Sequence, residues 1–465
     1  MNIRKYFNIF ILAVLVLPML SGCGLKQGNT AAVKELQAPI TLKYWRVFDG
    51  KDAFTEIINA YRKEHPNVNI EYKKLRYDEY EDALIEAWAE DRGPDIFSIH
   101  NSWISKYDSK ISTMPESYKL PYVTKRNKKS GDVEAADYKQ VKGVTPIDIR
   151  NNFAEVVYGD VVRGDKVMGL PLSVDSLALF YNRTMLDNAA ITKVPTTWVE
   201  VKNAVKKLTL QDDSGNIVSA GIAMGSADNI NRATDIVSLL MMQNGTQMVD
   251  SSGRAVRFHS SSPYADDKNY KPGMEALRFY TDFALPSKEV YNWNADMPEA
   301  TEAFISGRLA MMLGYSYQLP LIKAQGAKLN LGVAPVPHIN ANGTDATGTQ
   351  VNMASYWVET VSKKTEHENY AWDFLKFATS KDNVSKYLKS AKKPTALRSL
   401  VDSQLSDIDV GPFANQVLTA RSWYKGRNAL AAEEIFRDMI SYVIEGKNTA
   451  EEAINFSAQR INQTL

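Results

Sequence analysis

Alternating and helically spaced apolar residues follow one another in a regular order along the first folded part of the chain. Residues 40–47 alternate and are rich in strand-forming types, residues 54–61 place apolar side chains at helical spacing, and residues 68–72 alternate again. A helical pattern over residues 80–88 and a short strand at 95–99 complete a βαβαβ unit. This unit predicts a parallel sheet that binds ligands outside the carboxyl ends of its strands, so the loops after the first and third strands should border a site.

The remainder of the chain continues the α/β pattern and then becomes mostly helical. Between the two halves, residues 106–150 are polar and contain the basic cluster 125–129, and we interpret this segment as a solvated excursion, with a docking surface as the alternative. The length of 465 residues and the hydrophobic content of 44% predict two or more lobes. Further helices are expected at residues 198–208, 232–244, 274–283, 369–379, 384–390, 433–445 and 450–465.

The N-terminus has the organisation of an export signal. Two basic residues precede an apolar stretch over residues 9–20, which is shorter than the roughly 20 residues that span a membrane but typical of a signal peptide. Leu20-Ser21-Gly22-Cys23 then resembles a lipobox, and Cys23 is the only cysteine of the chain. We therefore expect residues 1–23 to be a lipoprotein signal peptide with its lipobox and residues 24–38 to be a tether. The protein should be exported and held by a lipid on Cys23 at the extracytoplasmic face of the cell membrane.

The sequence lacks the usual motifs of catalysis. It has no G-x-S-x-G, H-E-x-x-H, P-loop or dinucleotide-binding motif, and its five histidines show no metal-ligand spacing. Residues 212–216 resemble a hairpin turn more than a calcium loop. The net charge of +1 does not favour nucleic acid as a partner. We therefore expect no enzyme, no cofactor and no metal site, and keep an exported polysaccharide-acting hydrolase as the alternative because carboxylates are plentiful.

Aromatic residues are concentrated near the predicted ends of strands and helices, often beside polar residues. A sugar ring has apolar faces and a rim of hydroxyl groups, so a site that binds it needs flat aromatic surfaces surrounded by hydrogen-bonding groups. Packing in the core is the alternative for each aromatic residue taken singly. The aromatic candidates are Trp45, Phe48, Trp103, Trp293, Tyr315, Tyr356, Trp357, Trp423 and Tyr424.

Five short motifs occur along the chain in the order of a known family. Gly169-Leu170-Pro171, followed by Tyr181-Asn182 and by Pro195-Thr196-Thr197-Trp198, is the most specific of them. The others are the segment 54–70, Gly93-Pro94-Asp95-Ile96-Phe97, Phe304-Ile305-Ser306-Gly307-Arg308-Leu309-Ala310-Met311, and Ala371-Trp372-Asp373-Phe374-Leu375. Together they resemble the family 1 extracellular solute-binding proteins of ABC transporters, the group that includes maltose-binding protein. The excursion at 106–150 has no counterpart in compact members.

The resemblance implies an α/β fold of the two-lobed periplasmic-binding-protein type II class, with hinge-crossing segments and a ligand in the cleft between the lobes. Its N-terminal lobe would contain residues 39–174 and 360–397, and its C-terminal lobe residues 175–359 and 398–465. Asp175 takes the place of an acidic residue at the hinge. The expected crossings lie near 174–175, 356–359 and 394–398.

The expected function is capture of a small ligand and its delivery to the permease subunits of an ABC transporter by a monomer. A sugar or oligosaccharide is the favoured ligand, and a sensory binding lipoprotein that works without a transporter is a further alternative. The predicted ligand-binding residues are Trp45, Phe48, Asp49, Asn101, Ser102, Trp103, Asp175, Asn229, Trp293, Tyr315, Ser316, Tyr356, Trp357, Arg398, Trp423 and Tyr424.

Overall fold

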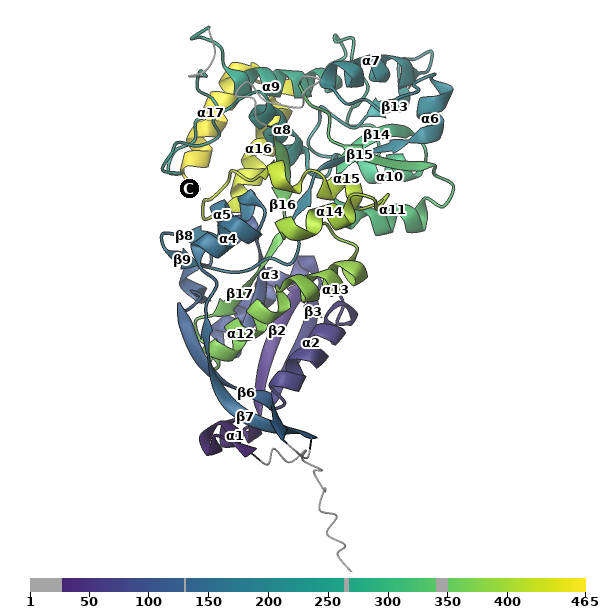
Figure 1. Ribbon diagram of the computed structural model, residues 1–465. Helices are drawn as coiled ribbons and strands as arrows, with labels where there is room; N and C mark the ends of the chain where they lie inside the picture. The colour runs from purple at the N-terminus through teal and green to yellow at the C-terminus, as the bar shows by residue number, and fades with distance from the viewer. Residues whose placement is uncertain (1–26, 129–130, 263–266, 340–349) are drawn as a thin grey trace, which may run out of the picture.

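The computed structural model describes residues 27–128, 131–262, 267–339 and 350–465. The chain forms two α/β lobes, one below the other in Figure 1. Each lobe has its own five-stranded sheet and its own hydrophobic core, which agrees with the expected fold class. Cys23, the predicted lipidation site, lies outside the described residues.

The first lobe is built on a sheet in the order β3-β2-β4-β17-β5. β2, β3 and β4 are parallel, as the βαβαβ pattern predicts, and β17 runs antiparallel to β4. The strands are β2 (Ile40–Val47), β3 (Val68–Leu75), β4 (Ile96–His100), β5 (Ile111–Ser112) and β17 (Trp357–Ser362), and a separate pair consists of β8 (Val162–Arg163) and β9 (Lys166–Val167). The helices are α2 (Asp52–Glu64), α3 (Tyr77–Ala89), α4 (Pro146–Asn152), α5 (Glu155–Val161), α12 (Glu368–Ala378) and α13 (Lys381–Ala391).

The second lobe is built on a sheet in the order β12-β13-β14-β11-β15. The strands are β11 (Ala178–Asn182), β12 (Leu210–Gln211), β13 (Ile217–Ile222), β14 (Leu309–Gly314) and β15 (Leu331–Pro335). The helices are α6 (Arg183–Asn188), α7 (Trp198–Leu208), α8 (Ala233–Gln243), α9 (Pro272–Thr281), α10 (Ala300–Ile305), α11 (Leu319–Gln325), α16 (Ala429–Ile444) and α17 (Ala450–Asn462). Two short helices follow, α14 (Val401–Gln404) and α15 (Gly411–Ala414), and α15 contacts β15 of the second lobe.

The predicted helices are confirmed, with ends that differ by a few residues. Local capping signals fix where such helices begin. At α7, the Thr197 hydroxyl accepts a hydrogen bond from the Glu200 N–H, and the Glu200 carboxylate accepts one from the Thr197 N–H. This reciprocal capping satisfies N–H groups that the first turn of a helix leaves without partners. The segment 212–216 is a turn between β12 and β13, as expected, and its Asp212 carboxylate accepts backbone hydrogen bonds from Ser214 and Asn216.

A small third sheet, in the order β10-β16-β18, joins the lobes. β10 (Asp175–Ser176) pairs antiparallel with β16 (Asn352–Ser355), which pairs parallel with β18 (Ala420–Arg421). The core of the first lobe includes Val174 and that of the second begins at Leu177, so the chain passes from one core to the other beside Asp175.

The other two crossings differ from the expected positions. At the second crossing, the chain passes from the second core to the first between Met353 and Ala354. Because β17 belongs to the first sheet, residues 357–359 are part of the first lobe and not of the second. At the third crossing, Leu400 still packs in the first core and Phe413 in the second. The chain therefore continues past the crossing expected near 394–398, through α14 and α15 to β18.

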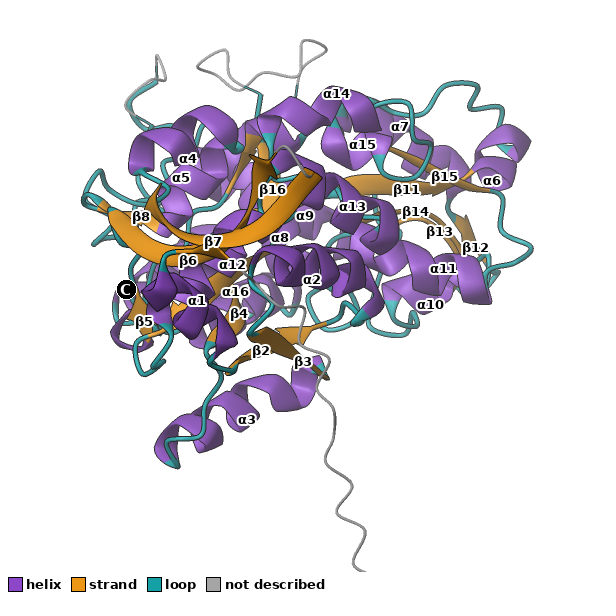
Figure 2. Ribbon diagram, turned by 60° about the horizontal axis from the view of Figure 1, so that its bottom comes forward, coloured by secondary structure: helices purple, strands orange, loops and turns teal. Residues whose placement is uncertain are grey.

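The segment expected to be a solvated excursion forms a long β-hairpin of β6 (Ser117–Lys128) and β7 (Gly131–Lys142). Its β6 strand packs against α2 and α12, and the Tyr118 and Tyr122 hydroxyls donate hydrogen bonds to the Asp373 carboxylate on α12. Figure 2 shows the hairpin lying across this part of the lobe. The expectation was wrong because a polar sequence conceals alternate apolar positions, among them Leu120, that face the lobe.

Part of the expected tether is also folded. β1 (Gln27–Gly28) pairs parallel with β7, and α1 (Thr30–Gln37) buries Ala32 and Leu36 against the hairpin. The Glu35 carboxylate accepts hydrogen bonds from the Tyr138 and Tyr370 hydroxyls. Within the described ranges, no helix is long and apolar enough to cross a membrane. No group of His, Cys, Asp or Glu side chains among those residues is arranged to hold a metal ion.

Candidate functional site

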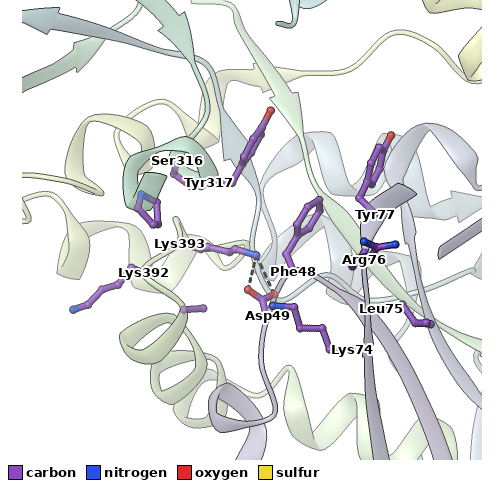
Figure 3. Close-up of a pocket in the computed structure, with 12 residues that line it drawn as sticks. Phe48, Asp49, Lys74, Leu75, Arg76, Tyr77, Ser316, Tyr317, Lys392 and Lys393 are labelled. Carbon is purple, nitrogen blue, oxygen red and sulfur yellow. Dashed lines mark hydrogen bonds and ion pairs between the residues drawn. The ribbon is translucent and has the colours of Figure 1, made fainter. Parts of the chain in front are cut away.

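A cavity of about 320 Å³ lies between the two lobes. The first lobe contributes residues from the ends of β2 and β3, including Phe48 and Tyr77, and the second contributes Ser316 and Tyr317, which follow β14. Figure 3 shows these side chains around the cavity. The carboxyl ends of parallel strands meet at one edge of a sheet, and here the edges of both lobes face the same space.

Aromatic rings form the wall on the side of the first lobe. The Phe48 ring is stacked with the Tyr77 ring at a centroid distance of 5.9 Å and meets the Trp357 ring edge-on at 5.8 Å. Phe48 has a φ of 69°, a left-handed conformation that bulky residues rarely adopt. Its side chain is 42% exposed, so this strained position presents a ring to the cavity instead of burying it.

Trp357, at the start of β17, lies at the centre of a larger aromatic group. Its ring contacts those of Tyr80, His100 and Trp103 at centroid distances of 5.9, 6.0 and 5.6 Å. Burial and, to a lesser extent, the positive charge of Arg232 lower the pKa of His100 to about 4. His100 is therefore neutral at pH 7, where its Nδ1 and Nε2 lie 2.8 and 3.0 Å from the hydroxyls of Ser102 and Ser355.

A network of buried ion pairs in the first lobe supports the aromatic wall. The Arg46 guanidinium lies 3.1 Å from the Glu359 carboxylate and 3.2 Å from that of Asp49. Asp49 also pairs with Lys393 at 2.8 Å and accepts a hydrogen bond from the Tyr387 hydroxyl. Although burial alone would raise the pKa of Asp49, the charges of Arg46 and Lys393 lower it below its ordinary value. These pairs hold the end of β2, and with it Phe48, in place.

On the side of the second lobe the cavity is lined by Ser316, Tyr317 and Pro320, and charged groups lie behind them. Tyr317 reaches across the cavity to stack on Phe48 at a centroid distance of 6.3 Å, and Tyr315 stacks behind it at 6.1 Å. The Tyr315 hydroxyl donates a hydrogen bond of 2.7 Å to the Asp235 carboxylate. Two nitrogens of Arg232 donate to the same carboxylate oxygen, at 2.9 and 2.7 Å.

Arg232 and its partners come from two helices of the second lobe. Arg232 precedes α8 with a φ of 69°, and its guanidinium also lies 3.6 Å from the Glu433 carboxylate on α16. Burial would lower the pKa of Arg232, but the charges of Asp235 and Glu433 raise it, so the arginine stays charged.

Asp175 connects the hinge sheet to this wall. Its carboxylate accepts hydrogen bonds from the Ser316 N–H at 3.2 Å and from the Ser316 hydroxyl at 2.7 Å. Burial raises the pKa of Asp175 to about 6, although the hydrogen bonds from Ser316 oppose this rise. Because Ser316 and Tyr317 are adjacent in the chain, a change in the hinge at Asp175 is passed directly to the cavity wall.

The structure brings one part of the predicted ligand-binding set to the cavity or to the rings and hinge beside it. Phe48, Asp49 and Ser316 line the cavity itself, and Tyr315 lies behind its second-lobe wall. The predicted residues in this group are Phe48, Asp49, Ser102, Trp103, Asp175, Tyr315, Ser316 and Trp357.

The other predicted residues do not reach the cavity. Trp293 is fully buried, and its Nε1 donates to the Asn229 side chain at 2.9 Å. The Trp423 Nε1 donates to the Ser238 hydroxyl, and the Tyr424 hydroxyl donates to the Thr464 carbonyl. These aromatic residues lie in the second core, because side chains at the ends of strands and helices can point inward as readily as outward.

Four further predicted residues also have structural partners elsewhere. Trp45 is buried in the first core, and the Lys73 ammonium lies 4.4 Å from its ring centroid. The remaining residues form the contacts Asn101 with Asp160, Tyr356 with Asp160, and Arg398 with Glu155.

Several residues of the site were not predicted from the sequence. Tyr77 follows the second parallel strand, and the rule that pointed to the loops after strands one and three applies equally to it. Tyr317 lies two residues after Tyr315, and only the turn at 316–318 shows which of the two rings faces the cavity. Arg232 and Asp235 carry no local signal, because long-range packing of α8 brings them to the site.

The site offers flat ring faces on one side and the hydroxyl groups of Ser316 and Tyr317 on the other, which is an arrangement for holding a small amphipathic ligand. The family model described as bacterial extracellular solute-binding protein matches residues 49–385. The multiple sugar-binding protein of Streptococcus mutans is 23% identical over 283 residues, a match that covers 60% of this chain and 63% of that protein.

The maltotriose-binding protein of Pyrococcus abyssi is 21% identical over 346 residues, which cover 72% of this chain and 61% of that protein. Both relatives are thus matched over less than two thirds of their length. The crystal structure of cyclic alpha-maltosyl-1,6-maltose binding protein from Arthrobacter globiformis has the same fold, with a TM-score of 0.70 at 18% identity over 92% of this chain and 99% of that one. The family consists of binding proteins, in agreement with the lack of catalytic motifs. The chain belongs to the bacterial extracellular solute-binding proteins.

Proposed function

We propose that the protein binds an oligosaccharide between its lobes and delivers it to the permease of an ABC transporter. The observation that carries this proposal is the row of near-parallel rings of Tyr77, Phe48 and Tyr317, in which the last ring comes from the opposite lobe. Stacked rings at an interlobe cavity suit the apolar faces of sugar units. The sugar-binding activity named for two relatives supports the same ligand class.

A group of polar side chains lies behind the second-lobe wall, where Tyr315 stacks on Tyr317. Arg232, Asp235 and Tyr315 hold one another by hydrogen bonds, so their orientation is fixed before a ligand arrives. A group oriented in advance loses little conformational entropy on binding. The positive charge of Arg232 lies between two carboxylates, which avoids an isolated buried charge in the cavity wall.

Ligand binding is tested with protein lacking residues 1–23, by thermal unfolding and calorimetry with a panel of neutral and acidic oligosaccharides. A ligand present at 100 times its Kd should stabilise the native state by about 2.7 kcal/mol. Phe48→Ala should weaken binding by about 1–2 kcal/mol through the loss of ring stacking. Phe456→Ala, on α17, is the matched control, because Phe456 is 47% exposed and Phe48 42%. Stabilisation by peptides or amines alone, with no response to any sugar, would contradict the ligand class.

We further propose that Cys23 carries a lipid that holds the mature chain at the membrane. The lipobox-like segment 20–23 and the lone cysteine support this assignment. Cells grown with labelled palmitate should incorporate the label into the wild-type protein but not into Cys23→Ala. A labelled Cys23→Ala protein, or an unlabelled wild type that is expressed and exported, would refute it.

Delivery to a transporter is tested separately from binding. Deletion of the gene should abolish uptake of the sugar that the purified protein binds, and expression of the wild-type protein should restore it. Unchanged uptake together with tight binding would instead identify a sensory binding lipoprotein.

A further inference from the structure

Basic side chains predominate among the charged residues that line the interlobe cavity. Five charged residues line the cavity, and four of them are cations: Lys74, Arg76, Lys392 and Lys393. The fifth is Asp49, whose carboxylate is already bound by Lys393 and by the buried Arg46. In Figure 3 the Phe48 ring lies between the Lys393 and Arg76 side chains, while Lys392 extends away from the ring.

The positive charge of these cavity-lining residues is only partly compensated by carboxylates. Arg76 pairs with Asp78 at 3.6 Å and with Glu79 at 3.2 Å, but its side chain is 75% exposed and such surface pairs are weak. Among the described residues no ion pair is recorded for Lys74. Lys393 is only 17% exposed and holds its charge beside the cavity through its contact with Asp49.

The second-lobe side of the cavity carries no charge of its own, since it is lined by Ser316, Tyr317 and Pro320. Behind these residues, the charge of Arg232 is paired with the carboxylates of Asp235 and Glu433. A neutral oligosaccharide gives no reason for four cations to line the cavity beside a single carboxylate that is already paired. A ligand with an acidic group would match this excess of positive charge.

We infer that the ligand is an acidic oligosaccharide whose sugar carboxylate faces Lys74 and Arg76, with Lys393 adding to the field. This inference rests on the proposed function and specifies its ligand. The rings of Phe48 and Tyr77 stack on the sugar faces, and the cations bind the carboxylate by charge-assisted hydrogen bonds. Arg76 is suited to this because its planar guanidinium can bind both carboxylate oxygens at once.

The test compares ligands that differ only in charge. Trimers of galacturonate, guluronate and glucuronate, their methyl esters, and neutral maltotriose and galactotriose are titrated into protein lacking residues 1–23. At least one free acid should bind at least tenfold more tightly than its own ester, and this preference should decrease as salt is raised because salt screens exposed charges. Inorganic sulfate should give less stabilisation than the trimer.

Two double variants locate the charge. Lys74→Gln/Arg76→Gln should weaken binding of the acidic trimer about tenfold and leave its ester unaffected, whereas Lys202→Gln/Lys207→Gln, which removes two charges from the exposed face of α7, should leave both unchanged. Equal binding of acid and ester, or binding of neutral sugars only, overturns the inference while the proposed function stands. Sulfate as effective as the trimer shows a simple anion site and also overturns it. No response to any sugar overturns both.

Discussion

The two walls of the interlobe cavity present different chemistry to the same ligand. The wall of the first lobe is a set of rings around Phe48 and Trp357, supported from below by buried ion pairs. The wall of the second lobe contributes the Tyr317 ring and the Ser316 hydroxyl, and the paired charges of Arg232 and Asp235 lie behind it. Each wall satisfies one half of an amphipathic ligand, so only the closed arrangement of the lobes makes a complete site.

The largest effect should come from an aromatic residue that belongs to neither wall. Trp293→Ala should lower the free energy of unfolding by about 3–5 kcal/mol, because it empties a fully buried position. Urea unfolding of the ligand-free protein measures this loss. The ligand affinity of the folded variant should equal that of the wild type. Weaker binding with unchanged stability would place Trp293 in the site after all.

Breaking the support of the aromatic wall should have the next largest effect. Glu359→Gln leaves the buried Arg46 with Asp49 as its remaining ion-pair partner and should destabilise the protein by about 3 kcal/mol. Glu79→Gln, which removes an exposed partner of Arg76, serves as the control and should leave the free energy of unfolding nearly unchanged. If both variants unfold alike, the buried network does not hold the wall.

Breaking the polar group behind the second-lobe wall should act on affinity more than on stability. Asp235→Asn replaces the carboxylate that accepts hydrogen bonds from Arg232 and Tyr315 with a neutral amide, which removes the charge that orients Arg232. Calorimetry should show a loss of about 2 kcal/mol in binding, typical of a charged hydrogen-bonding group. Tyr315→Phe deletes only the hydroxyl and should lose about 1 kcal/mol. Equal affinity of all three proteins would assign ligand binding to the rings alone.

The smallest effect should be a change of stability with pH, to which His100 in the first lobe and Asp175 at the hinge contribute with opposite signs. The pKa of His100 is lowered to about 4, so the stability it contributes is complete above its unfolded pKa near 6.5 and is lost as the pH falls toward 4. The pKa of Asp175 is raised to about 6, so its contribution is present below about pH 4 and is lost as the pH rises through 6. Between pH 7 and 5 the two changes oppose each other.

Single variants separate these two contributions. On acidification from pH 7 to 5, His100→Gln should gain about 2 kcal/mol relative to the wild type, and Asp175→Asn should lose about 1 kcal/mol. Thermal or urea unfolding at both pH values provides the measurement. Parallel pH profiles for both variants and the wild type would show that neither group titrates in this range.

The sequence was sufficient for the architecture but only partly for the site. Periodicity revealed α2 and α7 and the parallel strands β2 and β3, because each is an amphipathic element whose pattern is local. The hairpin β6–β7 was missed because charged residues alternate with the few apolar ones that face the lobe. Local pattern also cannot separate Phe48 from Trp293, since both are aromatic residues near loops.

What distinguishes these two aromatic residues is a long-range property. Phe48 turns outward through a left-handed backbone, and Trp293 turns inward to bond Asn229. Local pattern also could not reveal Arg232 and Asp235, because their place behind the cavity wall depends on how α8 packs in the second lobe. The family resemblance could predict that a cleft exists, but not which side chains face it.

The hinge sheet has a consequence for affinity that does not depend on any contact with the ligand. Strands from three distant segments pair there, with Asp175 opposite Ser355 and Asn352 opposite Ala420. Movement of the lobes must therefore twist a hydrogen-bonded ribbon, whose stiffness sets the fraction of molecules that are closed before ligand arrives. Because the apparent Kd equals the intrinsic Kd divided by that fraction, a substitution in this ribbon can retune affinity over orders of magnitude while the cavity stays chemically unchanged.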